Sequence, residues 1–386
     1  MHKLLSSVLL LFSLVVVGCQ HNKGSQSAAS YLNDTVSVDS SQLQIRPHYA
    51  QGFTVAYRSG ICLVDIHDPQ LADGEVFRYA LVKRGAKPAD IPAGYTIIET
   101  PVRSVICMTT LQLSNFIKLS ETSHVVGVTS TRHLFNKQMN AQIENGQTRR
   151  IGIEGNFNNE MVMALDPDLI LISPYKRGGY DVLKEVQIPL VPHLGYKEMT
   201  PLAQAEWIKF VGLLLGEEAK ADSTFNVIAD RYNQVKALAA NVKTRPVVLS
   251  GELHGGNWYA VGGKSFLAQL FRDAGAEYFL QDNPASGGVN LDFEMVYSQA
   301  NRADFWRILN SYPGKYSYDA LKDTDERYAD FRAFKERGVI YCNLRETPYY
   351  EEMPTSPEYL LEDFVHVFHP ELLPTDYQPH FYTRLK

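Results

Sequence analysis

The chain has 386 residues, a formal net charge of −6, 45% hydrophobic and 21% charged residues. This is the composition of an ordinary globular protein, and at roughly 100–200 residues per domain the length predicts two domains. The mild acidic charge argues against a nucleic-acid partner.

The N-terminus has the layout of a secretory signal. Lys3 precedes the apolar run LLSSVLLLFSLVVVGC, which is shorter than the roughly 20 residues that a spanning helix needs. Its end resembles a bacterial lipobox and implies cleavage before Cys19 and lipid modification of that residue; a simple signal peptide with a chance cysteine is the alternative. We expect a signal peptide over residues 1–19 and a flexible polar tether over residues 20–44.

The other three cysteines, Cys62, Cys107 and Cys342, all lie in apolar, strand-like runs. An odd number cannot pair completely, and their spacing is not that of a metal site. The sequence therefore predicts buried free thiols.

The globular part opens with strands. FTVAYRSGICLVDI predicts a hairpin turned at Ser59 and Gly60, and FRYALV and YTIIET predict two further strands. The apolar runs SVICMTT, HVVGVTS, LILIS and IPLVPHL then alternate with the helical patterns TLQLSNFIKLS and NEMVMAL. This alternation predicts a parallel sheet covered on both faces, and we place an N-terminal α/β lobe at residues 45–200.

A helical region is expected at residues 201–244. Trp207, Phe210, Val211 and Leu214 keep helical spacing up to Gly216. The next run, EEAKADSTFNVIADRYNQVKALAANV, has no internal Gly or Pro. It predicts a helix of about 24 residues, roughly 36 Å long, which is enough to cross from one lobe to the next.

The α/β rhythm then resumes in a C-terminal lobe, residues 245–386. VVLSG, WYAVG, ADFWRIL and VIYCNL predict strands, and GKSFLAQLFRDAGA, FEMVYSQA and FRAFKER predict helices. The expected fold is α/β: two lobes, each with a central, mainly parallel sheet flanked by helices, joined by one long α-helix.

This layout resembles the helical-backbone class of periplasmic substrate-binding proteins, the ABC-importer components that bind cobalamin, ferric siderophores or haem. The resemblance spans residues 103–344 and is carried by SVICMTTLQLSNFIKLSETSHVVGVT, IGIEGNFNNEMVMALDPDLILIS, GKSFLAQLFRDAGAEYFL and NLDFEMVYSQANRADF. It implies a monomeric, lipid-anchored binding protein on the periplasmic side of a bacterial membrane. Its partners would be an ABC permease and ATPase in the inner membrane, and it would have no enzymatic activity and no cofactor.

The unit Glu-Met-Val occurs once in each lobe, beginning at Glu160 and Glu294. In the family that the chain resembles, one glutamate on each lobe contacts arginines of the permease, and the resemblance assigns this role to these two residues. A carboxylate can meet an arginine fork bidentately. The alternative is that each glutamate only stabilises a helix N-terminus through the helix dipole.

The ligand is expected between the lobes, at the carboxyl ends of the strands. The candidate ligand-binding residues follow predicted strands and are Tyr175, Arg177, Tyr196, His254, Trp258, Tyr259 and Arg345. Aromatic rings and arginines suit an anionic, partly aromatic ligand, which favours a ferric siderophore or haem. Cobalamin, which is nearly neutral, is the alternative.

Two other classes fit less well. A protein that binds a free metal ion could use the pair His366 and His369, but these lie in a C-terminal tail expected to pack on the surface of the second lobe, so no metal site is predicted. A secreted hydrolase would need a motif such as G-x-S-x-G or H-E-x-x-H, and the sequence has neither. No catalytic residue is therefore predicted.

Overall fold

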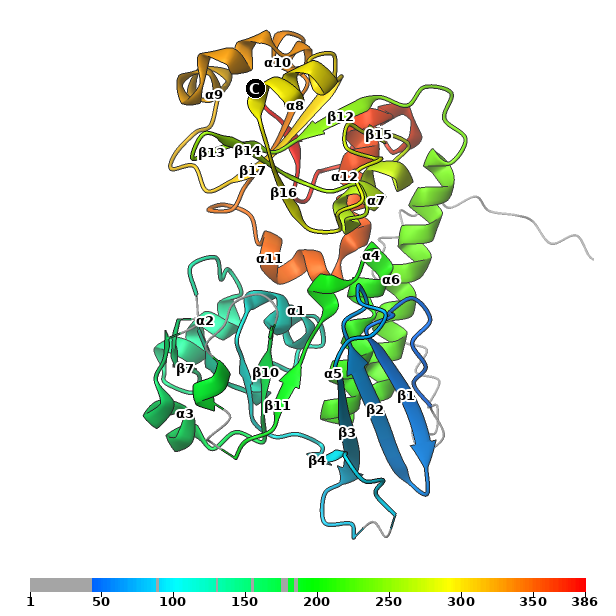
Figure 1. Ribbon diagram of the computed structural model, residues 1–386, viewed down its shortest axis with the longest axis vertical. Coiled ribbons are helices and arrows are strands. Elements are labelled where there is room, and N and C mark those ends of the chain that lie inside the picture. Colours follow the sequence, from blue (N-terminus) through cyan, green and yellow to red (C-terminus); the bar gives the residue numbers. More distant parts are fainter. Residues whose placement is uncertain (1–43, 88–89, 130, 154–155, 175–179, 184–186) are drawn as a thin grey trace, which may run out of the picture. The chain divides into compact units, whose positions relative to one another are not determined.

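In the computed structural model, the expected strands form two five-stranded sheets, a four-stranded sheet and smaller pairings (Figure 1). The structure describes residues 44–386 except 88–89, 130, 154–155, 175–179 and 184–186. The expected signal peptide and Cys19 lie outside the described residues, as does the expected tether except for its last residue. Residues 40–386 belong to one compact unit.

The four-stranded sheet opens the described chain. Its strands are β1 (Phe53–Arg58), β2 (Ile61–His67), β3 (Val76–Lys83) and β4 (Thr96–Thr100), paired in that order. The hairpin predicted at Ser59 and Gly60 is confirmed, and both residues have the positive φ, 50° and 78°, that a tight hairpin turn requires. One face of the sheet packs on the helical region, where the rings of Phe53 and Trp207 are 5.0 Å apart.

Two buried carboxylates fix the start of this sheet. One oxygen of Glu206 accepts hydrogen bonds from the backbone N–H groups of residues 48–50, at 2.8, 2.6 and 2.8 Å. Glu198 accepts from the N–H groups of residues 51–52, at 3.0 and 2.8 Å. Because hydrogen bonds to a carboxylate are stronger than those between neutral groups, the entering chain is held firmly on the first lobe.

The first lobe is built on a parallel sheet in the order β11-β10-β5-β6-β7. All four residues of β10, an interior strand of this sheet, are buried, as expected of a sheet covered on both faces. The elements are β5 (Val105–Cys107), α1 (Thr110–Lys118), β6 (Val125–Val128), α2 (Lys137–Glu144), β7 (Arg149–Arg150), the hairpin β8 (Gly152–Ile153) and β9 (Asn156–Phe157), α3 (Asn159–Leu165), β10 (Leu169–Ile172) and β11 (Leu190–Pro192).

Three helices follow: α4 (Pro201–Ala205), α5 (Trp207–Leu215) and α6 (Glu218–Ala239). Helix α5 ends at Gly216, whose φ of 71° is left-handed, which is the usual glycine C-cap. Helix α6 has 22 residues and buries an apolar stripe that includes Phe225, Ile228 and Tyr232. It runs alongside both lobes (Figure 1), as the sequence predicts.

The second lobe repeats the plan. Its large sheet has the order β15-β12-β17-β18-β19, parallel except for β19. The strand predicted from WYAVG belongs instead to a small antiparallel sheet, β13-β14-β16. The elements are β12 (Val247–Ser250), β13 (Glu252–His254), β14 (Asn257–Val261), α7 (Phe266–Asp273), β15 (Glu277–Tyr278), β16 (Gly288–Leu291), α8 (Phe293–Ala300), β17 (Phe305–Asn310), α9 (Tyr318–Thr324), α10 (Arg332–Lys335), β18 (Val339–Asn343), α11 (Tyr349–Glu352), α12 (Pro357–Phe368) and β19 (Thr383–Arg384).

Short 3-10 helices occur between these elements. They are η1 (Thr122–His124), η2 (Tyr180–Leu183), η3 (Gly195–Lys197), η4 (Glu326–Asp330), η5 (Met353–Thr355) and η6 (Pro370–Leu372). The predicted fold class, two α/β lobes with mainly parallel sheets and a long connecting helix, is confirmed.

The lobes also meet through a segment that the sequence does not single out. Residues 349–356, which we call the strap, comprise α11 and η5 and pack against α1 of the first lobe. The Nζ of Lys118 in α1 donates to the Ser356 hydroxyl at 2.9 Å, and the N–H of Phe135 donates to Glu351 at 2.7 Å. In Figure 1, α11 lies between the two lobes.

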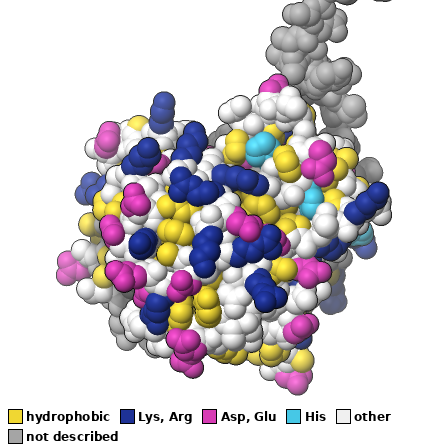
Figure 2. All heavy atoms as spheres, turned by 90° about the horizontal axis from the view of Figure 1, so that it is seen from above, with side chains coloured by type: hydrophobic (Ala, Val, Ile, Leu, Met, Phe, Trp, Pro, Cys, Tyr) yellow, Lys and Arg dark blue, Asp and Glu magenta, His cyan; other side chains and the backbone are white. Residues whose placement is uncertain are grey.

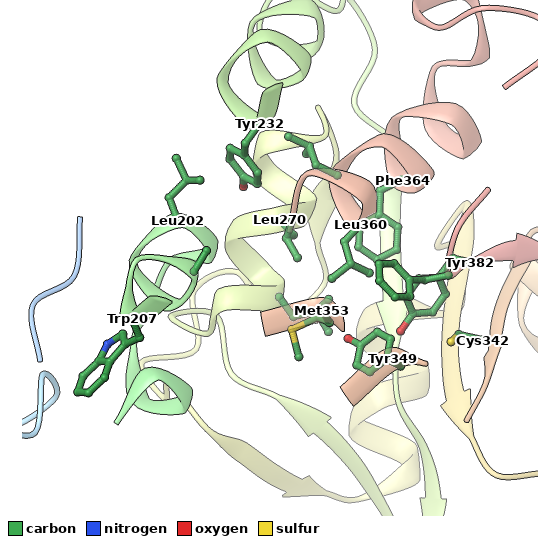
Figure 3. Packing of buried hydrophobic residues seen from close by; sticks show 14 of the residues in the cluster. Leu202, Trp207, Tyr232, Leu270, Cys342, Tyr349, Met353, Leu360, Phe364 and Tyr382 are labelled. Atoms are coloured by element: carbon green, nitrogen blue, oxygen red, sulfur yellow. The ribbon is translucent and has the colours of Figure 1, made fainter. Parts of the chain in front are cut away.

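The strap completes a continuous apolar core. Tyr349 and Met353 point into one cluster with Leu202 of α4, Leu270 of α7 and Leu360 of α12 (Figure 3). The same cluster extends to the apolar residues of both large sheets. The lobes are therefore joined by shared packing as well as by α6.

Cys62, Cys107 and Cys342 are free thiols. Cys107 and Cys342 are buried as predicted, whereas Cys62 is half-buried. Burial raises the pKa of Cys62 and of Cys342 to about 12. Within residues 44–386, gaps excepted, no helix combines the length and the apolar content that crossing a membrane would require.

Candidate ligand site

A cavity of about 340 Å³ opens at the carboxyl edge of the second lobe's large sheet. Its floor comes from the end of β12 and from β17, its sides from the β13-β14 hairpin and the start of α7, and its wall toward the first lobe from the strap. The volume is at the lower end of the ~300–1,000 Å³ of small-molecule sites. The carboxyl edge is where open α/β sheets bind ligands, so this cavity is the candidate ligand pocket.

Arg307, in the middle of β17, lines the floor of the pocket. Its Nε donates to the hydroxyl of Tyr382 at 2.7 Å, and its guanidinium carbon lies 5.3 Å from the centre of that ring. A second nitrogen, Nη1, is 3.5 Å from the Ser250 hydroxyl. Among the described residues no carboxylate forms an ion pair with this guanidinium, although the group is always charged.

Glu252, the first residue of β13, lines the same pocket. One carboxylate oxygen accepts a hydrogen bond from the side-chain amide of Asn310 at 3.2 Å, and the other lies 3.6 Å from Nε2 of His254. Burial raises the pKa of Glu252, while Asn310, His254 and Arg307 partly offset that effect. The pocket thus holds a cation and a carboxyl group that do not pair with each other.

Aromatic and apolar side chains form most of the remaining wall, including Phe266, Tyr259, Tyr349, Tyr350 and Met353. Tyr259 is 46% exposed, so a ligand could stack on its ring. The ring of His254 stands edge-on to it, with centroids 6.2 Å apart. Of the residues predicted to bind ligand, His254 and Tyr259 are the two that the structure brings together in this pocket.

The prediction that Trp258 contacts the ligand is wrong. Its side chain is fully buried, because neighbouring residues of β14 point to opposite faces and Tyr259 takes the pocket side. The indole packs against Trp306 at 5.6 Å, and its N–H donates to the Ser250 carbonyl at 3.0 Å. Trp258 therefore supports the pocket floor from beneath.

Two further predicted ligand residues, Tyr196 and Arg345, do not line this pocket. Tyr175 and Arg177 lie outside the described residues. Tyr196, in η3, lines a small cavity of about 10 Å³ in the first lobe. Arg345 is exposed just after β18, where its Nε donates to the Ser311 carbonyl at 2.9 Å.

At the corresponding edge of the first lobe, the described residues close around that small cavity. Gln112 donates to the Ser173 hydroxyl at 3.1 Å, and Asn115 lies 3.2 Å from the His193 ring nitrogen. Pro354 of the strap also lines the cavity. Burial lowers the pKa of His193 to about 4, so this ring is neutral at pH 7.

Glu160 and Glu294 are both exposed and lie in the first turns of α3 and α8. Glu160 borders a shallow depression of about 440 Å³ with Arg149, Met161 and Leu165. Glu294 lies in the electrostatic field of Arg327, which forms an ion pair with Asp325 at 2.8 Å. Figure 2 views the molecule from above Figure 1, where α8–α10 lie, and shows basic side chains across the middle of that face with acidic ones among and around them.

Sequence reasoning missed Arg307, Glu252 and the tyrosine pair of the strap. A signal exists for each. Arg307 is a charged residue in the middle of the predicted strand ADFWRIL, and Glu252 stands two residues before the predicted ligand residue His254. Tyr349 and Tyr350 follow the predicted ligand residue Arg345 by four and five residues. Within the part of the chain that the structure describes, no group of three or more His, Cys, Asp or Glu side chains is placed to hold a metal ion.

Comparison with known proteins agrees with this architecture. Residues 105–345 match the periplasmic binding protein family. An uncharacterized lipoprotein of Methanocaldococcus jannaschii is 25% identical over 408 residues, covering all of both chains.

Two solved structures share the fold. A periplasmic haem-binding protein from Pseudomonas aeruginosa has a TM-score of 0.57 at 18% identity and covers 74% of this chain and 98% of its own. The molybdate-binding periplasmic protein of a Haemophilus influenzae ABC transporter has a TM-score of 0.56 at 15% identity and covers 71% and 88%.

Proposed function

Because the chain belongs to the periplasmic binding protein family, we propose that it is the substrate-binding lipoprotein of an ABC importer. It captures an iron complex, a ferric siderophore or haem, between its two lobes and delivers it to a membrane permease. The family consists of binding proteins, not enzymes, and such proteins carry a ligand rather than a cofactor.

The observation that carries this proposal is the pocket at the carboxyl edge of the second sheet. It combines a half-buried guanidinium, the exposed ring of Tyr259 and a wall contributed by the strap between the lobes. Cations with aromatic walls suit an anionic ligand that has flat apolar parts. A haem-binding protein of the same fold supports an iron complex as the first class to test.

The mature chain would be held at the periplasmic side of the membrane by lipid on Cys19 and would act as a monomer. This part of the proposal comes from the lipobox-like sequence and from the similarity to a protein named as a lipoprotein. The partners are the permease and the ATPase of the importer.

The first experiment is a tryptophan fluorescence titration of the chain from Asn22 onward with haemin, several ferric siderophores and cyanocobalamin. Trp258 and Trp306 donate hydrogen bonds to the carbonyls of Ser250 and Gly251 on the pocket floor, at 3.0 and 2.8 Å, so a ligand there should change their emission. We expect saturable quenching by one iron complex.

Metal-free siderophores and N-acetyltryptophanamide at the same concentrations control for weak binding and for light absorption. Quenching by cyanocobalamin alone would replace the iron complex with a corrinoid. If none of these ligands gives saturable quenching, the iron-complex proposal fails.

Glu160 and Glu294 are proposed as the two contacts with the permease. Both are exposed and lie one on each lobe, so together they would orient the protein on its partner. Replacing both by Ala should lower uptake of the radiolabelled iron complex by about tenfold or more, because pairing with arginine is lost. Ligand affinity should stay unchanged.

The matched control replaces Glu144 and Glu336, which are also exposed and lie one on each lobe. That double variant should transport normally. A large loss of ligand binding on replacing Glu160 and Glu294 would contradict the docking role.

A further inference from the structure

Arg307 differs from two arginines on the surface of the second lobe, Arg327 and Arg332. Arg327 pairs with Asp325 at 2.8 Å and Arg332 with Asp304 at 3.0 Å, and both are exposed on the surface. Arg307 is half-buried at the floor of the pocket, and its guanidinium hydrogen-bonds to the hydroxyls of Tyr382 and Ser250. Water already solvates the two exposed guanidinium groups, and each has a carboxylate partner, whereas the half-buried Arg307 forms no ion pair with a carboxylate of the described residues.

A charge that is partly withdrawn from water without a counter-charge is costly, and proteins normally pair such groups or use them. Arg307 lines the cavity floor, so the missing counter-charge can come from a molecule in the pocket. A guanidinium presents its N–H groups as a fork that matches a carboxylate.

The walls of the pocket decide between an organic and an inorganic anion. Phe266, Leu267, Leu309 and Met353 face the same cavity as Arg307. A small oxyanion such as molybdate needs hydrogen-bond donors on all sides, and these apolar side chains supply none. An organic acid with an apolar or aromatic body can use both the walls and the guanidinium.

Glu252 sets a limit on the charge of that ligand. Its carboxyl group lines the same pocket and is bonded to Asn310. A second negative charge on the bound group would be repelled by it. One carboxylate is therefore accommodated better than two.

We propose that Arg307 anchors the ligand through a single carboxylate carried on an apolar or aromatic body, and that Glu252 weakens the binding of anions at this position. The inference rests on the proposed role of the pocket in ligand capture, and it names the part of the ligand that enters the second lobe. Arg307 and Glu252 are accordingly the residues that determine charge specificity.

The test uses probes matched in shape and different in charge. Benzoate and 2-hydroxybenzoate are compared with benzamide and 2-hydroxybenzamide, and binding to the full-length chain is measured by saturation-transfer NMR at pH 7.5. We expect each carboxylate to bind about tenfold or more tightly than its amide, in the millimolar range accessible to such small probes.

Two variants test whether Arg307 and Glu252 cause the preference for carboxylates over amides. Arg307→Gln should bring carboxylate and amide to within about twofold of each other, while amide binding shows that the pocket still exists. Glu252→Gln keeps the shape and the contact with Asn310, and it should tighten carboxylate binding by about threefold to tenfold because a repulsion is removed. Arg327→Gln, on the surface of the same lobe, is the control and should keep the preference of the native chain.

Equal binding of acids and amides, or binding of neither at millimolar concentration, overturns the proposal. So does a carboxylate preference that survives Arg307→Gln. If Arg307→Gln fails to fold, the test rests on Glu252→Gln. Carboxylate binding by Glu252→Gln that is unchanged or weaker than that of the native chain is incompatible with the proposal. A carboxylate preference in a chain that binds no iron complex would overturn the proposed function and leave this inference standing.

Discussion

The carboxyl edges of the two large sheets have the same architecture and different interiors. In the second lobe this edge opens into a cavity of about 340 Å³. In the first lobe the described residues close around about 10 Å³, hardly more than the space for one water molecule. The comparison teaches that a sheet edge becomes a site only where the surrounding segments leave it open.

The polar groups at the two edges explain the difference further. In the first lobe Gln112 donates to Ser173 and Asn115 bonds to His193. Pro354 of the strap lines the same cavity. In the second lobe Arg307 and Glu252 face a common space without pairing. Bonded polar groups stabilise a structure, whereas groups left without full partners are available to a ligand.

The strap contributes to the closed edge of the first lobe and to the pocket wall of the second. The strongest test of its role is to remove a buried apolar side chain from it. Met353 is 6% exposed and lies in the cluster that both lobes share. Met353→Ala should lower the free energy of unfolding by about 2–5 kcal/mol, because buried surface is lost and a cavity forms. Urea denaturation followed by circular dichroism measures the change.

Met163→Ala is the matched control, since this methionine is 54% exposed on α3. Its effect should stay within about 0.5 kcal/mol. Equal effects of the two substitutions would show that the strap is only a surface loop and would break the comparison between the lobes.

A contact between α12 and α1 should also make the free energy of unfolding depend on pH. Glu358, in the first turn of α12, lies 4.0 Å from Nζ of Lys118 in α1. Burial raises the pKa of Glu358 to about 7, Lys118 and Arg231 partly oppose the shift, and Glu362 adds to it. The folded protein therefore keeps a proton that the unfolded chain releases near pH 4.5.

The stabilising effect of this group is complete below about pH 4.5 and is lost as pH rises toward 7. From pH 4 to pH 8, the stability of Glu358→Gln relative to the native chain should rise by on the order of 3 kcal/mol. Thermal or urea unfolding across this range gives the difference. The control is Glu371→Gln, at an exposed position of the same C-terminal region, whose stability should change with pH in parallel with that of the native chain. If the stability of Glu358→Gln also changes in parallel with that of the native chain, the prediction is wrong.

The sequence predicts the repetitive parts of this molecule well. Apolar runs such as that of β10 need only burial on both faces, and α6 needs only an uninterrupted amphipathic pattern, so both are visible in the residues themselves. The strap is different. Tyr349 and Met353 stand in a tail broken by prolines, and their burial depends on contacts with α1, α4 and α7, which no local pattern contains.

The same limit applies to the site. The rule that ligands bind at carboxyl ends of strands correctly selects His254 and Tyr259 as lining residues of the pocket. It fails for Trp258 because the face of the sheet to which each side chain of β14 points depends on the pairing of β14 with β13 and β16. The rule does not identify Arg307, because the sequence of its strand shows only an arginine among apolar residues and not that the side chain lines a cavity.

The smallest expected effect compares one side chain from each edge. Tyr259 is 46% exposed in the pocket of the second lobe, and Tyr259→Ala should weaken binding of 2-hydroxybenzoate about threefold to tenfold through loss of ring contact, with little change in stability. His193 is buried in the first lobe, 4.8 Å from the ring of Trp207, so His193→Ala should lower stability and leave that affinity unchanged. Saturation-transfer NMR measures the affinity of both variants, and urea denaturation measures their stability. We expect Tyr259→Ala to change mainly the affinity and His193→Ala to change mainly the stability. Weaker binding in His193→Ala at unchanged stability would mean that the first lobe contacts the ligand here, and the contrast between a closed edge and an open one would no longer explain where the ligand is held.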